Sequence, residues 1–175
     1  MNWLEFLDAK HNVIKSKMPS DAEFKQACEA QIAQMNQFIT NEFNCIYVTG
    51  KQYADWFWTM KEMMTEDGGE YSRFGTRVKI KSGSISFEWY KNRVAPPGDN
   101  GKKKVYSEYL PKGIHSDGYP LSTFKNALEW ENKIIREVEG RYVVLRKRAK
   151  VLAKMRSNLK EYERLLADSY LPNKD

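Results

Sequence analysis

A run of lysines and arginines near the end of the chain has the spacing of a phosphate-binding helix face. Three of its cations recur every four residues and share one helical face, and the two others lie beside them. Residues 141–160 contain no Asp or Glu. Like charges so arranged repel one another, and a bound phosphate backbone would remove that repulsion while releasing its own counterions. The candidate phosphate ligands are Arg146, Lys147, Arg148, Lys150 and Lys154.

A second group of cations lies on a predicted β-hairpin at about residues 76–91. Apolar and polar side chains alternate there, and Ser82-Gly83 supplies a two-residue loop. This register pairs Val78 with Phe87 and gives one apolar face and one face of cations separated by small hydroxyls. A two-stranded ribbon fits the major groove of DNA. The candidate cations are Arg77, Lys79, Lys81, Lys91 and Arg93.

Both groups have a plainer interpretation. Lysines and arginines are common on the solvated face of a coiled coil, although such a face usually includes glutamates as well. The polar side of the hairpin matches the water-facing side of an ordinary antiparallel sheet. The basic helix, which lacks Asp and Glu over residues 141–160, therefore supports nucleic-acid binding more strongly than the hairpin does.

Residues for covalent or metal chemistry are scarce. The sequence has no Walker, dinucleotide-binding, zinc-protease or nucleophile-elbow motif. His11 and His115 lie on unrelated segments, and Cys28 and Cys45 form no CxxC pair. We expect a protein that is not an enzyme and that binds no cofactor and no metal.

The first half of the chain is expected to be helical. A short helix is predicted over residues 3–17, and a capping box at Ser20–Glu23 opens a second helix that runs to about residue 43. Residues 45–48 are predicted to be extended. A further capping box at residues 49–52 opens the next helix, which ends at Gly68-Gly69. Trp56, Phe57 and Trp89 fall on apolar faces and should pack in the core, whereas Trp58 is the predicted exposed aromatic.

The second half should contain a third strand and one long helix. Residues 94–101 with Lys102–Lys104 are predicted to form a flexible basic loop, followed by a strand at Val105–Leu110. From Ser122 to about Asp168 the spacing is helical, with a heptad of apolar positions over residues 124–152. Gly140 marks a candidate break or close-packing point.

These elements predict an α+β fold with N-terminal helices, a small antiparallel sheet and a long C-terminal helix. We expect one domain over residues 1–175, with a helical part at 1–70, the sheet at 71–118 and the long basic helix at 119–170. The formal net charge of +6 lies in the last 35 residues, because 141–175 hold 10 Lys/Arg and 4 Asp/Glu. The sequence lacks a signal-peptide pattern and an apolar run of about 20 residues, so we expect a soluble cytoplasmic protein without membrane contact.

The second half of the chain carries a set of residues typical of one protein family. They are Ile85-Ser86-Phe87-Glu88-Trp89-Tyr90-Lys91, Tyr119, Phe124, Ala127, Trp130-Glu131, Glu137-Val138-Glu139, Arg141 and Leu145-Arg146-Lys147. Over roughly residues 85–150 the chain therefore resembles the MobI type of conjugative transfer protein, found on plasmids and other mobile genetic elements. The resemblance implies an auxiliary relaxosome factor that acts at the origin of transfer and helps a separate relaxase begin strand processing.

Charge geometry and resemblance together predict a non-enzymatic DNA-binding accessory protein for conjugation. The expected partners are double-stranded DNA, a relaxase or other transfer protein, and a second copy of the chain. The rival hypothesis is a coiled-coil adaptor or regulator encoded by a mobile element. Burial separates the two, because an adaptor loses its dimer interface if the 124–152 heptad face is covered within one chain.

Overall fold

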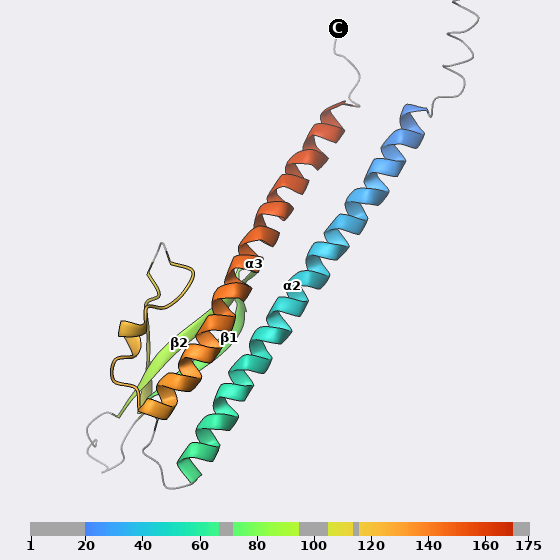
Figure 1. Cartoon of the computed structure of the whole chain (residues 1–175). Helices are drawn as coiled ribbons and strands as arrows, with labels where there is room; N and C mark the ends of the chain where they lie inside the picture. The colour runs from blue at the N-terminus through green and yellow to red at the C-terminus, as the bar shows by residue number, and fades with distance from the viewer. Residues whose placement is uncertain (1–19, 67–71, 95–104, 114–115, 170–175) are drawn as a thin grey trace, which may run out of the picture. The chain divides into compact units, whose positions relative to one another are not determined.

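The computed structural model describes residues 20–66, 72–94, 105–113 and 116–169. Its elements along the chain are helix α2 (Asp21–Glu66), strands β1 (Phe74–Lys81), β2 (Ser84–Val94) and β3 (Val105–Tyr109), the short 3-10 helix η1 (Leu121–Phe124) and helix α3 (Glu129–Ser169), as Figure 1 shows. The predicted helix at 3–17, His11, the Gly68-Gly69 stop, the Lys102–Lys104 loop and His115 lie outside the described residues.

Two long helices and a three-stranded antiparallel sheet confirm the predicted α+β class. The described residues divide into two compact units, residues 20–40 with 155–169 and the described part of residues 41–154. We call the described residues of the first, 20–40 and 155–169, the terminal helix pair, and the second the central unit. That the whole chain is one domain stays a prediction.

The sheet has the strand order β1-β2-β3 and the predicted hairpin register, with Val78 opposite Phe87. Ser82 and Gly83 have φ angles of 48° and 75°, so both loop residues are left-handed, as a tight hairpin turn requires. The third strand is confirmed at Val105–Tyr109, with Tyr109 opposite Tyr90.

The predicted capping box opens α2. The Ser20 amide donates to Glu23 Oε2 at 2.8 Å, and the Glu23 amide donates to Ser20 Oγ at 3.3 Å. These bonds satisfy two of the amides that a helix start leaves without partners. The backbone bond from Ser20, and then its hydroxyl, lowers the pKa of Glu23.

The predicted extended run at 45–48 and the second capping box are wrong, because α2 continues through both. Ile46 is fully buried, and this burial outweighs the modest helix propensity of the segment. Gly50 is needed for a different reason. A Cβ there would lie 2.5 Å from the Phe87 ring, so the glycine lets sheet and helix approach closely.

Helix α3 begins at Glu129, later than predicted, because residues 121–124 form η1. Gly140 neither breaks the helix nor marks close packing, since it is exposed and a Cβ there would meet nothing within 4 Å. The heptad face is buried at most of its positions: Phe124, Glu131, Ile135, Val138, Tyr142, Leu145 and Leu152.

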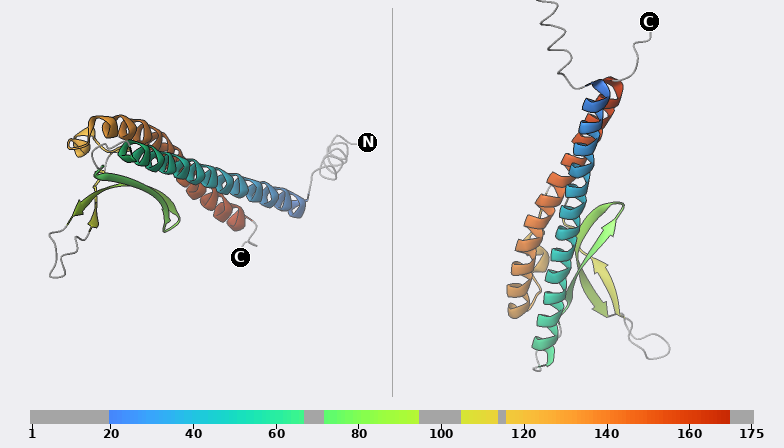
Figure 2. Two further views of the ribbon diagram at one scale, coloured as in Figure 1. Left: turned by 90° about the horizontal axis from the view of Figure 1, so that it is seen from below. Right: turned by 90° about the vertical axis from the view of Figure 1, so that its right-hand side faces the viewer.

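In the central unit both helices pack on one face of the sheet (Figure 2). Trp89 of β2 is fully buried and meets Phe57 of α2 edge-on at 5.2 Å and Phe124 at 5.3 Å. Phe57 and Trp89 thus pack in the core as predicted. Trp56 does not, because it is 38% exposed.

Helix side chains cover the free edge of β1. Trp58 Nε1 donates to the Thr76 carbonyl at 3.1 Å, and Lys61 Nζ donates to the Phe74 carbonyl at 3.3 Å. The Glu131 carboxylate accepts the Phe74 amide at 3.0 Å. Trp58 is therefore half-buried rather than exposed, and β1 presents fewer open backbone groups for edge-to-edge pairing.

Candidate nucleic-acid interface

Four lysines gather on the outer surface of the central unit. Lys147, Lys150 and Lys154 lie at i, i+3 and i+7 of α3, so they share one face of the helix, and all three are exposed. The segment after β3 brings Lys112 to the same place, where it lies close enough to Lys150 for their charges to interact. We call these four residues the lysine cluster.

The lysine cluster has a strong positive excess. Lys150 forms an ion pair with Asp117, and the Asp117 carboxylate also interacts electrostatically with Lys147 and Lys112. The hydrogen bond from Lys150 lowers the pKa of Asp117. Burial, and then the neighbouring charges of Arg146 and Lys150, lower the pKa of Lys112. In the described part of the chain no carboxylate forms an ion pair with Lys112, Lys147 or Lys154.

Arg146 is not part of this exposed surface, because only 8% of it is accessible. Its guanidinium donates to the Glu139 carboxylate at 2.7 and 3.2 Å, to the Phe87 carbonyl at 3.0 Å and to the Asp117 carbonyl at 2.9 Å. Arg146 therefore joins α3 to β2 and to the turn at Asp117. Its donors serve the protein, so we remove Arg146 from the predicted phosphate ligands.

Arg148 is exposed but points toward α2. Its Nη2 donates to Glu42 Oε2 at 2.7 Å. Because this charge already has a partner on another helix, Arg148 adds less to the cationic surface than Lys147 and Lys154, which form no ion pair in the described residues.

The hairpin cations Arg77 and Lys79 share one carboxylate. Glu88 Oε2 lies 2.8 Å from Arg77 Nε and 2.9 Å from Lys79 Nζ. Burial by itself would raise the pKa of Glu88, but hydrogen bonds from Lys79, Arg77 and Ser86 outweigh it and the pKa is lowered. Lys81, near the hairpin loop, is exposed.

Lys91 and Arg93 lie on the opposite face of the sheet from Arg77. Side chains alternate along a strand, and both follow Trp89 at two-residue steps. Lys91 Nζ sits 5.8 Å from the centre of the Phe74 ring, and Arg93 pairs with Glu108 of β3. The five hairpin candidates therefore do not form one face.

The lysine cluster and the outer hairpin cations also point in different directions. α3 packs against the Phe87 side of the sheet through Tyr142, with ring centres 5.0 Å apart. Arg77, Lys79 and Lys81 project from the other side of β1. The lysine cluster and the outer hairpin cations are thus two separate surfaces. Only one of the four lysines forms an ion pair in the described residues, whereas two of the three hairpin cations pair with Glu88.

Lys112 was missed by sequence reasoning. It stands in a Pro-Lys-Gly turn outside both the hairpin and the helix, and only the fold brings it beside α3. The available signal was the basic balance of residues 73–112, which hold 10 Lys/Arg and 3 Asp/Glu.

The described residues form neither a membrane-spanning helix nor a metal site. No helix there combines the length and apolar character that crossing a bilayer demands. Nor do His, Cys, Asp and Glu side chains gather there in groups of three or more that could hold a metal ion.

The protein is therefore a basic α+β protein, in which a three-stranded antiparallel sheet packs against two long helices and a cluster of lysines lies on the surface. The family model described as MobI protein matches residues 46–160, about two thirds of the chain, and the chain belongs to the MobI family. The family is one of conjugative mobilisation. No curated protein and no solved structure matches the chain.

Proposed function

We propose that this protein is a non-enzymatic DNA-binding accessory factor in the initiation of conjugative transfer, acting at the origin of transfer beside a separate relaxase. Membership of the MobI family supports the link to conjugation. The observation that carries DNA binding is the lysine cluster, in which only Lys150 forms an ion pair with a carboxylate of the described residues.

The geometry of the lysine cluster suits a phosphate backbone. From Lys147 to Lys154 the helix rises about 10 Å at roughly 1.5 Å per residue. A duplex presents one negative charge per about 1.7 Å of its axis, so the three helical lysines can reach different phosphates. An ammonium group is a compact point charge that fixes position without reading sequence.

Duplex DNA is the favoured form. Proteins that hold unpaired strands usually combine cations with aromatic side chains on which bases stack. The lysine cluster contains no aromatic member, and the core aromatics Phe57 and Trp89 are fully buried. The outer hairpin cations Arg77, Lys79 and Lys81 stay a predicted second contact, weakened by their shared Glu88.

The coiled-coil adaptor is less well supported. Its dimer interface was to be the heptad face of residues 124–152, and that face is buried within the central unit. Two chains cannot pair through side chains that each chain has already covered.

A salt series tests DNA binding. Lys147→Gln, Lys150→Gln and Lys154→Gln together should reduce the slope of log affinity against log salt by about 2 to 3, at roughly 0.9 per lost phosphate contact. The matched control removes the same charge elsewhere, as Lys51→Gln, Lys125→Gln and Lys133→Gln, and should leave the slope near that of the wild type. No binding at low salt, or equal flattening by both variants, would contradict the proposal.

Two further measurements address the accessory role. With Mg²⁺ and supercoiled DNA that carries the origin of transfer, the protein alone should leave the DNA uncut, and adding it to a relaxase should increase nicking. Cleavage by this chain alone would refute a non-enzymatic function. An unchanged relaxase rate would refute the partnership while leaving DNA binding intact.

A further inference from the structure

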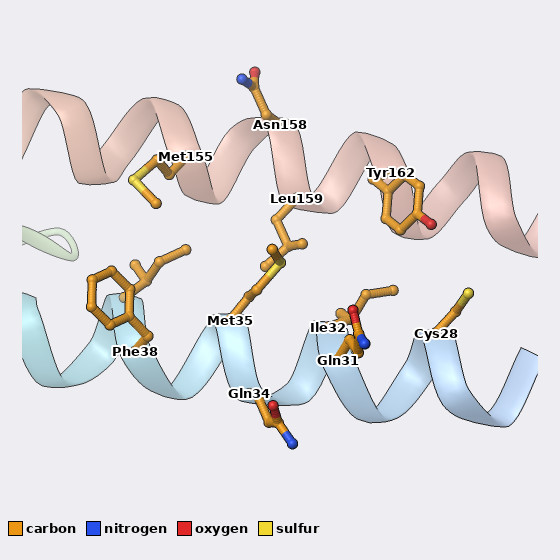
Figure 3. Close-up of a pocket in the computed structure, with 11 residues that line it drawn as sticks. Cys28, Gln31, Ile32, Gln34, Met35, Phe38, Met155, Asn158, Leu159 and Tyr162 are labelled. Atoms are coloured by element: carbon orange, nitrogen blue, oxygen red, sulfur yellow. The ribbon is translucent and has the colours of Figure 1, made fainter.

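The terminal helix pair has one polar face and one apolar face. On the polar face Asn36 Nδ2 donates to Glu163 Oε1 at 3.0 Å, and Lys25 and Glu29 line the same shallow hollow. On the other face a groove of about 940 Å³ runs between α2 and α3. Figure 3 shows Met35 and Leu159 meeting between the helices, with Phe38 and Met155 toward one end and Cys28 and Tyr162 toward the other.

The apolar face is unusually exposed. Among its large side chains Met35 is 56% accessible, Phe38 54%, Phe24 52%, Tyr162 49% and Met155 41%. Single exposed apolar residues are ordinary, but a contiguous group of this size on a soluble protein marks an interaction surface.

The spacing of these residues is that of a helix-packing seam. On α2, residues 24, 28, 31, 35 and 38 follow one another in alternating steps of four and three. On α3, Met155 and Tyr162 are one heptad apart. This repeat presents a stripe that fits between the helices of a partner.

We propose that this apolar face is a homodimer interface, at which the terminal helix pairs of two copies pack face to face as a four-helix bundle. Half-exposed large side chains offer on the order of 100 Å² each, given about 150–250 Å² for a buried aromatic. The five named above then bury roughly 1,000 Å² across two copies, the size at which specific interfaces begin.

Charge favours a second copy as the occupant. The side chains lining the groove are uncharged, whereas the charged ones of this helix pair, such as Lys25, Glu29 and Glu163, line the other face. Two identical faces can therefore meet about a two-fold axis without like-charge repulsion, as in an isologous dimer. The interface is distinct from the buried 124–152 heptad, and it does not depend on whether the protein binds DNA.

The test is oligomeric state, measured by sedimentation and light scattering of the full chain over a concentration series. The wild type should be a dimer that dissociates on dilution, with a melting temperature that rises with protein concentration. Met35→Glu with Phe38→Glu should shift it to a monomer at the same concentrations. Both side chains are more than half exposed, so helical circular dichroism should be retained.

The matched control adds the same two charges to the same helix, as Ala30→Glu with Ala33→Glu. Both residues are exposed, and Ala33 lines the opposite, polar face. This variant should stay dimeric. A monomeric wild type with a concentration-independent melting temperature would overturn the proposal, and so would a dimer broken by the control but not by the groove variant. If the groove instead binds a helix of another protein, the purified wild type should be a monomer, and the homodimer proposal is then wrong.

Discussion

Arg146 and Glu139 form a two-pronged ion pair inside the central unit, with N···O distances of 2.7 and 3.2 Å. The same carboxylate accepts Trp89 Nε1 at 2.7 Å and the Tyr119 amide at 2.8 Å. One pair on α3 thus holds β2 and the segment after β3. Because that segment carries Lys112, the buried pair also positions the lysine cluster.

Removing one member of this pair should be costly. Arg146→Ala leaves the Glu139 charge buried without its partner, and the free energy of unfolding should fall by about 3–5 kcal/mol. Arg146→Lys should rescue only part of the loss, since an ammonium group cannot make the paired bonds of a guanidinium. Urea unfolding followed by circular dichroism measures both.

The control is the exposed pair between Arg148 and Glu42. Arg148→Gln removes a bond of similar length, 2.7 Å, from a side chain that is 48% accessible. Exposed pairs contribute about 0–1 kcal/mol. If Arg146→Ala and Arg148→Gln destabilised the protein equally, burial would not be what gives the Arg146 pair its importance.

Two mid-helix glycines should respond in opposite directions to alanine. At Gly140 a Cβ meets nothing within 4 Å, so Gly140→Ala should stabilise the protein by roughly 1 kcal/mol through helix propensity. At Gly50 a Cβ would lie 2.5 Å from the buried Phe87 ring. Gly50→Ala should destabilise by about 1–2 kcal/mol, because overpacking exceeds the propensity gain. Thermal unfolding of both variants checks this, and two changes of the same sign would contradict it.

The features that could be predicted were local ones. The hairpin register follows from a two-residue alternation and a two-residue loop, since a one-residue slip would mix the faces. The cap at Ser20 and Glu23 follows from a four-residue motif, and its bonds are present. Each is decided by neighbours in sequence.

The features that could not be predicted depend on distant residues. In the sequence, Gly50 belongs to a motif that predicts a helix start. In the structure it lies inside α2, where the Phe87 ring of β2 leaves no space for a Cβ. Arg146 belongs to a basic row in the sequence, but Glu139 and Tyr119 bury it. Lys112 acquires its neighbours only when a turn folds back on α3. Tertiary contacts decided each of these positions against the local pattern.

The Glu88 carboxyl group should make the free energy of unfolding depend on pH in the acidic range. Its pKa lies below the ordinary 4.5, because hydrogen bonds from Lys79, Arg77 and Ser86 overcome the effect of burial. A carboxyl with a lowered folded pKa contributes stability above its unfolded pKa and loses it as the pH falls through the folded one. The gap in unfolding free energy between wild type and Glu88→Gln should therefore shrink as the pH falls from the ordinary pKa of 4.5 through the lower folded pKa.

Urea unfolding across that range measures the gap. Glu137→Gln is the control, since Glu137 forms an exposed pair with Arg141 one turn away. Its difference from the wild type should be small throughout. A gap for Glu88→Gln that stayed constant with pH would mean that the carboxylate charge is not what stabilises this face of the hairpin.

Single substitutions should tell which of the two cationic surfaces meets DNA. Lys150→Gln should weaken duplex binding and lower the salt slope by about 1. Lys112→Gln should weaken it less, because Lys112 is half-buried and its ammonium group donates to the Ser116 carbonyl. Lys81→Gln, on the outer face of the hairpin, should have a smaller effect, and Lys133→Gln, paired with Glu129, should have none. Fluorescence anisotropy with a labelled duplex over a salt series measures all four. If Lys81→Gln had the largest effect, the hairpin would be the principal interface, and α3 would serve mainly to hold the sheet.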